Sequence, residues 1–263
     1  MRSENFCPKI SIITPSFNQA SFIEETIQSV LNQNYPNLEY IIKDAGSTDG
    51  TLDIVKKYTK KYPKTVKLIT KKDNGQSDGI NQGIRESTGD IIGYLNSDDV
   101  YFPNTLEIVA KRFLKNGSTK WVTGDYVIID DKGNKIQSFV AFYKGFFRKK
   151  PSFLTLSLLN FIVQPSTFWR RSLIKEFGFF DRSLHYCMDY DFWLRIIKKY
   201  KPDVVNEKLS LFRIHKKSKG GSQYRKQFVE EHDVLKRYTS DFLLILLHKI
   251  HSKAIIFVYS LIK

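Results

Sequence analysis

Residues 9–44 read KISIITPSFNQASFIEETIQSVLNQNYPNLEYIIKD, and this stretch decides the fold. Its two ends are short apolar runs rich in Ile, which predict buried strands. Between them, the segment SFIEETIQSVLNQ places Phe22, Ile23, Ile27 and Val30 on one face of a helix. A strand, a helix and a second strand of these lengths predict a right-handed βαβ unit in a parallel sheet.

The same alternation continues as far as residue 95. The segments at 50–62 and 76–87 have helical periodicity, whereas those at 66–70 and 90–95 are short apolar runs typical of strands. Four strands that alternate with three helices predict an α/β fold, with a mostly parallel central sheet flanked by helices.

Beyond this region the pattern changes. Residues 104–116 and 188–200 are predicted to form helices. The segment WVTGDYVIIDDKGNKIQSFVAF (121–142) is predicted to form a hairpin, and PDVVNEKLSLFRIH (202–215) two short strands.

Length and composition limit the type of protein that the chain can form. The chain has 263 residues, 41% of them apolar, which fits one large globular domain or a domain with an appendage. Its two cysteines, Cys7 and Cys187, lie far apart and favour a reducing compartment over a disulfide framework. No long apolar run with a cleavage site opens the chain, so we expect a cytoplasmic protein.

The net charge of +15 is unevenly distributed. Residues 1–100 have a net charge of −1, residues 101–200 of +9 and residues 201–263 of +7. A basic remainder after a neutral first part predicts a surface that faces something anionic, such as a phosphate-bearing substrate, a nucleic acid or an anionic membrane.

The C-terminal segment, residues 241–263, is apolar but interrupted by His248, Lys249, His251 and Lys253. It therefore lacks the ~18–20 uninterrupted apolar residues that a spanning helix needs. An amphipathic helix lying in an anionic membrane surface fits this pattern, and so does a helix packed on the domain itself. The first interpretation would make the protein peripheral on the inner face of the plasma membrane.

Polar residues follow each of the four predicted strands. Residues 14–18, 44–49, 73–78 and 96–99 read TPSFN, DAGSTD, DNGQSD and NSDD. Carboxyl ends of parallel strands meet at one edge of a sheet, where open α/β sheets bind their ligands. The four loops therefore predict a binding site, although such sequences are also rich in turn-forming residues.

Asp98 and Asp99 stand at the mouth of a predicted buried strand. Neighbouring carboxylates repel each other, and burying them is costly unless a cation lies close. They indicate a cation site, and the alternative is a solvated pair that caps a helix beginning near Pro103. Carboxylate ligands without thiolates favour Mg2+ or Mn2+ over structural zinc.

Several function classes lose support. No dinucleotide-binding glycine motif follows the first strand, and no P-loop motif occurs. A nucleotidyltransferase remains an alternative, but TPSFNQASF lacks the glycine and basic residue expected around a triphosphate. A basic membrane- or nucleic-acid-binding module is the non-enzymatic alternative; an acidic sheet edge is a poor track for nucleic-acid phosphates, so we expect no nucleic-acid partner.

Four segments in the right order resemble the large inverting glycosyltransferase family 2, whose catalytic domain has the GT-A fold. They are residues 12–51, 73–99, 188–195 and 212–215, the last reading FRIH. The resemblance covers about residues 9–215. It implies a Rossmann-like, mostly parallel central sheet flanked by helices, with a C-terminal helical extension.

The resemblance also implies how the chain is divided. Residues 1–215 would form the GT-A catalytic domain, with a nucleotide-binding half at 1–100 and an acceptor-binding half at 101–215. Residues 216–263 would form a basic loop followed by an amphipathic helical segment.

The resemblance assigns roles to single residues. The expected nucleotide-sugar contacts are made by Thr14, Pro15, Asn18, Asp44, Gly75, Asp78, Asn96, Ser97 and Asp98. Asp98 is expected to hold the metal, assisted by Asp99 and completed by His215. Asp189 matches the catalytic base, with Asp191 as second choice. We also expect Gln164 and Trp169 to contact the acceptor, although aromatic residues are more often part of the core.

Two positions depart from the family pattern. Asn96 replaces the first carboxylate of the D-x-D-type motif, so its expected contact with ribose is a neutral hydrogen bond. Met188 stands where many relatives have Glu beside the catalytic Asp.

The implied reaction is a metal-dependent transfer of a sugar, with inversion, from a nucleotide-diphosphate sugar to a hydroxyl of a glycan or lipid-linked acceptor. Assembly of a bacterial surface polysaccharide would be consistent with the basic, partly apolar remainder of the chain. Base, sugar, acceptor and oligomeric state are left open.

Overall fold

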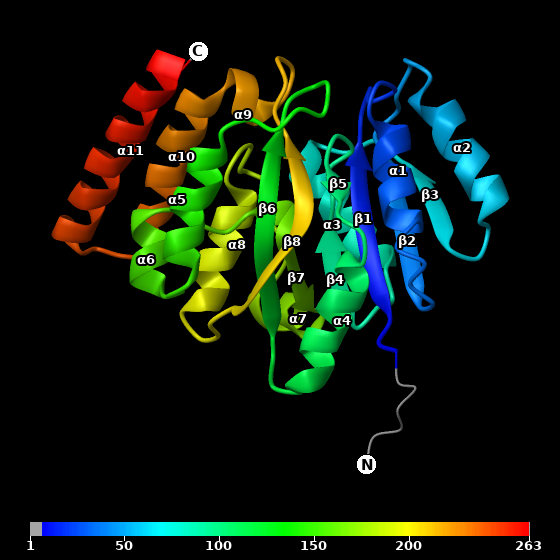
Figure 1. Ribbon diagram of the computed structural model, residues 1–263, viewed down its shortest axis with the longest axis horizontal. Coiled ribbons are helices and arrows are strands. Elements are labelled where there is room, and N and C mark those ends of the chain that lie inside the picture. Colours follow the sequence, from blue (N-terminus) through cyan, green and yellow to red (C-terminus); the bar gives the residue numbers. More distant parts are fainter. Residues whose placement is uncertain (1–6, 263) are drawn as a thin grey trace.

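The computed structural model describes residues 7–262 and contains one eight-stranded sheet with helices on both faces (Figure 1). The strands are β1 (Ile10–Ser16), β2 (Leu38–Asp44), β3 (Val66–Thr70), β4 (Ile91–Tyr94), β5 (Val100–Tyr101), β6 (Trp121–Ile129), β7 (Thr167–Arg170) and β8 (Asp203–Arg213). Their order across the sheet is β3-β2-β1-β4-β7-β6-β8-β5.

The helices alternate with the strands in the first part of the chain and gather at one end of the molecule in the last part (Figure 1). They are α1 (Ile23–Leu31), α2 (Thr51–Lys61), α3 (Gln76–Glu86), α4 (Thr105–Lys115), α5 (Ser138–Arg148), α6 (Phe153–Leu158), the 3-10 helix η1 (Gln164–Ser166), α7 (Ser172–Phe177), α8 (Met188–Ile197), α9 (Lys219–Ser222), α10 (Tyr224–Lys236) and α11 (Phe242–Ile262).

The predicted parallel sheet is confirmed. β1 pairs in parallel with β2 and β4, and β2 pairs in parallel with β3. β6 and β8 are also parallel, whereas β7 runs antiparallel to both β4 and β6, and β5 to β8. Strands buried by helices on both faces carry continuous apolar runs, which is why the Ile-rich segments could be recognised.

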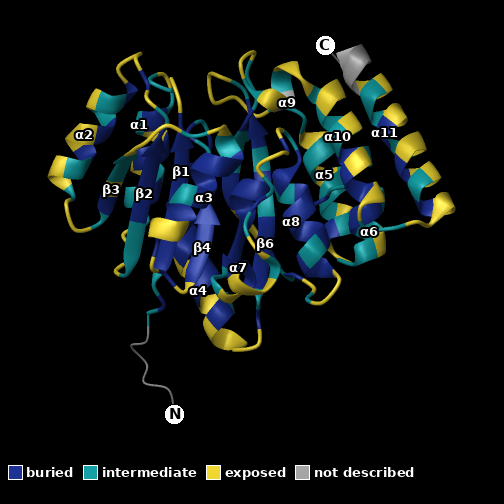
Figure 2. Ribbon diagram, turned by 180° about the vertical axis from the view of Figure 1, so that it is seen from behind, coloured by how far each residue is buried: buried dark blue, intermediate teal, exposed yellow. Residues whose placement is uncertain are grey.

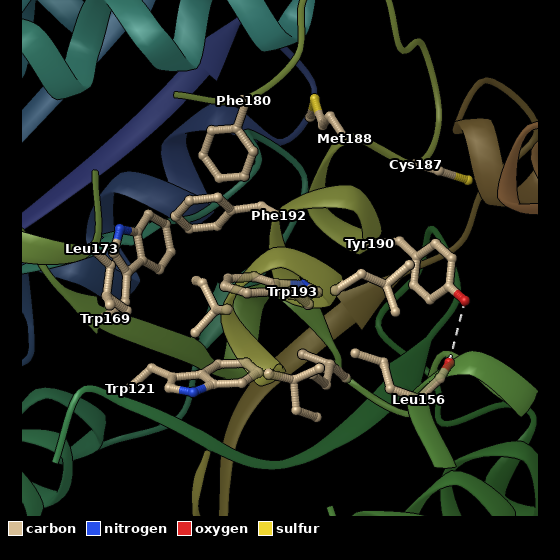
Figure 3. Packing of buried hydrophobic residues seen from close by; sticks show 14 of the residues in the cluster. Trp121, Leu156, Trp169, Leu173, Phe180, Cys187, Met188, Tyr190, Phe192 and Trp193 are labelled. Carbon is tan, nitrogen blue, oxygen red and sulfur yellow. Dashed lines mark hydrogen bonds between the residues drawn. The ribbon is translucent and has the colours of Figure 1, made fainter. Parts of the chain in front are cut away.

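Two apolar clusters, one on each face of the sheet, hold these elements together. One contains the inner faces of α1 and α4. The other contains α3 and α8 and is strongly aromatic (Figure 3). In it, Trp121 of β6 and Trp193 of α8 stack with ring centroids 5.3 Å apart, and Trp169 of β7 meets Trp193 edge-on at 5.5 Å. This cluster ties α8 to the sheet.

The predicted hairpin after β6 is wrong in its second half. Only Ile129 and Lys135 form an antiparallel bridge, and residues 138–148 form α5 instead of a strand. The aromatic residues of this segment recur at helical spacing, so Tyr143 and Phe147 pack on the aromatic cluster while other rings point outward.

The two short strands predicted at 202–215 are a single strand, β8. Its polar middle, Asn206 to Lys208, is exposed, and the pairing with β6 is interrupted there: Val204 is opposite Thr123, and the next paired residue is Lys208, opposite Asp125. The pairing contains register shifts between Thr123 and Tyr126, which allow the longer strand to follow its neighbour.

The C-terminal helix α11 packs on α6 and α10 and buries Leu244, His248 and Ser252. His248 Nδ1 lies 2.8 Å from the carbonyl oxygen of Ser157, and His251 Nε2 lies 2.8 Å from the hydroxyl of Tyr143. Burial lowers the pKa of His248 to about 4, so its ring is neutral near pH 7. Among residues 7–262, no helix has both the length and the apolar character that crossing a membrane requires.

Candidate functional site

The loops that follow β1, β2 and β4 meet at one edge of the sheet. Ser16 pairs with Asp44 across β1 and β2, and the backbone of Leu95 bonds to Ile13. Two cross-links join the first two loops: Asn18 Oδ1 accepts the N–H of Thr48, and the N–H of Asn18 bonds to the Ser47 hydroxyl.

Asp98 and His215 come together across 117 residues of sequence. His215 Nε2 lies 3.1 Å from Asp98 Oδ2, and the ring of Phe22 packs 4.8 Å from the imidazole. Arg213, at the end of β8, fixes this arrangement by donating from Nε to the Asp98 carbonyl oxygen at 2.8 Å. Two neighbouring ligands of an octahedral ion with bonds near 2.1 Å lie about 3 Å apart, so this pair has the spacing of metal ligands.

Asp99 does not share that position, contrary to expectation. It is 1% exposed, and its two oxygens accept hydrogen bonds from the backbone of Arg213 and from Asn96 Nδ2. Burial raises the pKa of Asp99 well above its usual value, and the charge of Asp98 adds to the effect. Asp99 therefore joins the β4–β5 loop to β8 and is not available as a metal ligand. Neither carboxylate caps α4, whose N-cap residue is Asn104.

Asn96 is the centre of a polar network. Its Oδ1 accepts a hydrogen bond of 2.7 Å from Gln76 Nε2, and its Nδ2 lies 3.3 Å from Gln164 Oε1. Lys219 of α9 donates to Gln76 Oε1 at 2.7 Å and to the carbonyl of His185 at 2.5 Å. The start of α9 thereby reaches the sheet edge.

The side chains of Asp44 and Thr14 form hydrogen bonds within the protein. Asp44 is fully buried, and its oxygens accept bonds from the N–H groups of Gly46 and Ser47 and from the Ser47 hydroxyl. The Thr14 hydroxyl is buried against the hydroxyl of Tyr40, 3.0 Å away. The Asp44 carboxylate thus holds the turn that follows β2, and the Thr14 hydroxyl contacts the neighbouring strand. Their expected contacts with a nucleotide stay predictions.

The other expected donor contacts are spread along the same edge. Asp78 is buried at the start of α3; burial alone would raise its pKa, but hydrogen bonds from Asn74, Gln82 and Arg182 outweigh this and lower it. Gly75 precedes that helix with φ of 108°. Pro15 and Ser97 are buried, and Asn18 is exposed.

Two residues at the end of β1 were not named singly among the expected contacts. Ser16, the last residue of β1, has a buried hydroxyl without a hydrogen-bond partner, and Phe17 is 57% exposed. Both lie in the segment 14–18, at the strand end where ligands of parallel sheets bind.

Asp189 lies half-buried in the first turn of α8. Burial raises its pKa, while the charges of Lys144 and Lys219 oppose the rise. Tyr94 is buried: burial raises its pKa, and the charges of Asp189 and Asp99 both add to the rise. A partly buried carboxylate with a raised pKa is a candidate general base.

The carboxylate of Asp191, the second choice for the base, already has two partners within the protein. It is 3% exposed, forms an ion pair with Arg195 at 2.9 Å and accepts a hydrogen bond of 2.5 Å from the Tyr238 hydroxyl. A carboxylate held by two partners inside the protein serves the packing of α8 and α10.

The two residues expected to contact the acceptor, Trp169 and Gln164, lie in different surroundings. Trp169 is fully buried among Trp193, Phe180 and Phe192, so the prediction that it touches the acceptor is wrong. Its large apolar area favours the core over a surface groove. Gln164 is 7% exposed and belongs to the network around Asn96, where its Nε2 donates to the Tyr94 carbonyl oxygen at 2.5 Å.

Glu230 of α10 was not predicted from the sequence. Its carboxylate accepts three consecutive backbone N–H groups, those of His185, Tyr186 and Cys187, at 2.9, 2.6 and 2.7 Å. These residues directly precede α8, so Glu230 fixes the position from which Asp189 projects. The neighbouring Glu231 is buried, and its pKa is raised to about 7 mainly by burial, with the charge of Lys144 opposing and that of Asp189 adding.

We expect Glu230→Gln to lower kcat roughly 10- to 100-fold, because one acceptor oxygen replaces two and the turn before Asp189 loosens. KM for the donor should change little, since no donor-edge contact is removed. Steady-state kinetics test this, with Glu207→Gln, an exposed position of β8, as the matched control. Glu230→Asp should recover part of kcat; equal kcat in all four proteins would contradict the positioning role.

No group of three or more His, Cys, Asp or Glu side chains able to hold a metal occurs within the described part of the chain. Asp98 and His215 would thus supply two ligands, and a bound ion would take the others from ligand phosphates or water. This is how Mg2+ is usually held at phosphate sites.

Comparison with known proteins agrees with this geometry. The family model described as "Glycosyl transferase family 2" matches residues 11–178. An uncharacterized glycosyltransferase of Rickettsia typhi is 31% identical over 218 residues, which make up 82% of this chain and 67% of that protein. TuaG of Bacillus subtilis, named for teichuronic acid biosynthesis, is 32% identical over 136 residues, 52% of this chain and 54% of TuaG.

Among solved structures, a mannosyltransferase from Pyrobaculum calidifontis in complex with GDP-Man and Mn2+ has a similar fold. The TM-score is 0.73 at 18% identity, over 94% of this chain and 70% of the other. This likeness shows the GT-A type of fold alone.

Proposed function

This chain belongs to glycosyl transferase family 2 and is a glycosyltransferase, and on that premise we propose that it moves a sugar, with inversion, from a nucleotide-diphosphate sugar to an acceptor hydroxyl. The observation that carries the proposal is the Asp98–His215 pair, 3.1 Å apart at the carboxyl edge of the sheet. Asp189, in the first turn of α8, is the proposed base. A cation site and a base are what a single displacement needs.

Donor binding is assigned to the loops after β1 to β4. Asp98 and His215 would hold Mn2+ or Mg2+. Ser16, Phe17 and Asn18, at the carboxyl end of β1, belong to the segment assigned to the donor. When bound, the ion offsets the negative charge that develops on the leaving diphosphate. Lys219, bonded to Gln76 at that edge, brings a further positive charge toward the same group.

The chemistry proposed for Asp189 is proton removal. As the acceptor oxygen forms its bond to the anomeric carbon, its proton passes to the Asp189 carboxylate. The bond from that carbon to the donor phosphate breaks, and the nucleoside diphosphate leaves with the electron pair. Attack from the face opposite the leaving group inverts the anomeric configuration.

We assign residues 1–100 to donor binding and residues 101–215 to the acceptor, with 216–263 as an extension that also supports α8. The acceptor is a hydroxyl of a glycan or lipid-linked saccharide. TuaG, a relative named for teichuronic acid biosynthesis, supports a role in assembling a surface polysaccharide.

We propose an anionic membrane surface as a partner of α11. This helix turns its histidines inward and leaves apolar side chains outside, so that exposed segments follow its outer side in Figure 2. Those side chains include Phe242 at 77% exposure and Phe257 at 64%, with Lys249 and Lys253 exposed beside them. A helix with this distribution lies in the interface of a membrane.

Calorimetric titration with UDP, GDP and dTDP tests the donor assignment. We expect one of them to bind with Mn2+ present and to lose at least about 10-fold in affinity with EDTA, because the ion links Asp98 and His215 to the diphosphate. Binding of the same strength with EDTA would contradict metal dependence, and no binding of any of the three would contradict the donor class.

A further inference from the structure

A groove of about 650 Å³ lies between α5 and the strands β6 and β8. The residues that line it come from 125–149 and 204–208, and none of them belongs to the loops of the donor edge. Part of the sheet is left open here, because α5 covers β6 only on one side and residues 206–208 of β8 are exposed. The groove is thus separate from the site where the nucleotide is expected.

Its lining is strongly cationic. Lys135, Lys149, Lys208 and Arg148 contribute four positive charges, and Asp125 is the single carboxylate among the lining residues. That carboxylate already accepts a bond of 2.7 Å from Arg148 Nη2. A net charge of about +3 over one groove attracts an anion, particularly where the sheet and a helix exclude part of the solvent.

Arg148 gives a second, independent indication of a ligand. Its side chain is 6% exposed, and its Nη1 atom is buried without a hydrogen-bond partner. A buried guanidinium group with a free donor is costly unless an acceptor satisfies it. An anion in the groove would provide that acceptor.

The rim of the groove is apolar. Phe142 and Phe146 line it at 74% and 68% exposure, and Phe139, one turn earlier on the same side of α5, is 74% exposed. Three exposed aromatic rings on one helix side need an apolar partner, because each leaves a large area in water. A simple inorganic anion would leave these rings uncovered.

We propose that this groove binds a phosphate group carried on an apolar chain, with the phosphate at Arg148, Lys149 and Lys208 and the chain along the Phe142 and Phe146 rings. Two sources share this chemistry: the headgroup of a membrane phospholipid, and the phosphate of a lipid-linked acceptor. The acceptor source rests on the proposed function, whereas the binding itself does not.

The position of α5 links the groove to catalysis. Lys144, on another side of the same helix, is close enough to Asp189 to oppose the rise of its pKa. A lipid phosphate in the groove would therefore lie one helix away from the base.

Calorimetry with n-octyl phosphate, below its micellar concentration, tests the site. Wild-type protein should bind it with at least about 10-fold higher affinity than inorganic phosphate, because the chain covers apolar rings. The Lys149→Gln/Lys208→Gln double variant should lose about 10- to 30-fold, and Phe142→Ser/Phe146→Ser a similar amount. Lys60→Gln/Lys64→Gln, exposed at the opposite end of the molecule, is the matched control.

Equal affinity in the Lys149→Gln/Lys208→Gln variant and the control would overturn the proposal, as would equal binding of octyl phosphate and inorganic phosphate. Tighter binding of a short oligonucleotide than of octyl phosphate would also overturn it.

Sedimentation with phosphatidylcholine vesicles, with and without phosphatidylglycerol, distinguishes the two sources of the phosphate. Lysine-dependent binding to the anionic vesicles indicates a phospholipid headgroup, and binding of the soluble compound alone indicates a lipid-linked acceptor. Asp98→Ala should leave octyl phosphate binding unchanged, so failure of the donor assignment remains distinguishable.

Discussion

Replacing Asp98 by Ala should remove the metal dependence of donor binding and lower kcat/KM by more than about 100-fold. In the proposed site, Asp98 and His215 hold the ion, and without Asp98 only the imidazole of His215 is left. The donor diphosphate would then meet an edge without the cation that offsets its charge. Kinetics over a range of Mn2+ concentrations, with calorimetry of the nucleoside diphosphate, measure both effects.

The control for this experiment is Asp53→Ala, which removes an exposed carboxylate from the first turn of α2. It should leave kcat/KM and the response to EDTA unchanged. Thermal unfolding should show both variants folded. If Asp98→Ala still binds the donor better with Mn2+ than with EDTA, the ion is held elsewhere and the assignment of Asp98 is wrong.

Asp189→Asn should lower kcat by about 10²- to 10⁴-fold and leave donor affinity unchanged, because it removes the proton acceptor and no donor contact. The pH profile of the wild type follows from the direction of its pKa shift. The carboxylate works only when ionised, and burial raises its pKa, so activity should fall with decreasing pH above the range of an ordinary aspartate. The variant should lack this acid limb.

Measuring the stability of the Asp189→Asn variant shows whether a loss of activity comes from the missing base or from a damaged fold. A carboxyl whose pKa is raised in the folded state stabilises the fold at low pH and loses that contribution as the pH rises through the raised pKa. At pH 8 the ionised, half-buried Asp189 is therefore unfavourable, and Asp189→Asn should unfold at a higher denaturant concentration than wild type. Asp191→Asn should do the opposite, since it weakens the buried pair with Arg195.

A variant Asp189→Asn that retained wild-type kcat would exclude this residue as the base. Loss of donor affinity together with kcat would instead place it in the donor pocket. Both outcomes are visible in one set of titrations and rate measurements.

Much of the fold was determined by local pattern. The Ile-rich strands, the amphipathic segments between them and the polar loops at the strand ends can be recognised because burial on both sides of a sheet requires continuous apolar runs. Asp98, Asp189 and His215 were also named as site residues from the sequence through the family resemblance. The fold brings Asp98 and His215 together.

What the sequence could not determine is which polar groups are already satisfied. Asp44 and Asp99 look as suitable for a ligand as Asp98, yet the structure gives their oxygens to Ser47 and to Arg213. Trp169 looks like a groove residue until the aromatic cluster surrounds it. Hydrogen bonding and burial depend on neighbours far away in the chain, which periodicity does not report.

The support of Asp189, the proposed base, is the clearest such case. Glu230 lies 43 residues beyond the Cys187 N–H that it holds, and nothing in its own segment distinguishes it from any acidic residue of a surface helix. Only the packing of α10 against α8 brings its carboxylate to that turn. The sequence by itself determined the elements and the candidate reacting groups, and the tertiary structure decided which of those groups face a ligand, because that depends on contacts between distant segments.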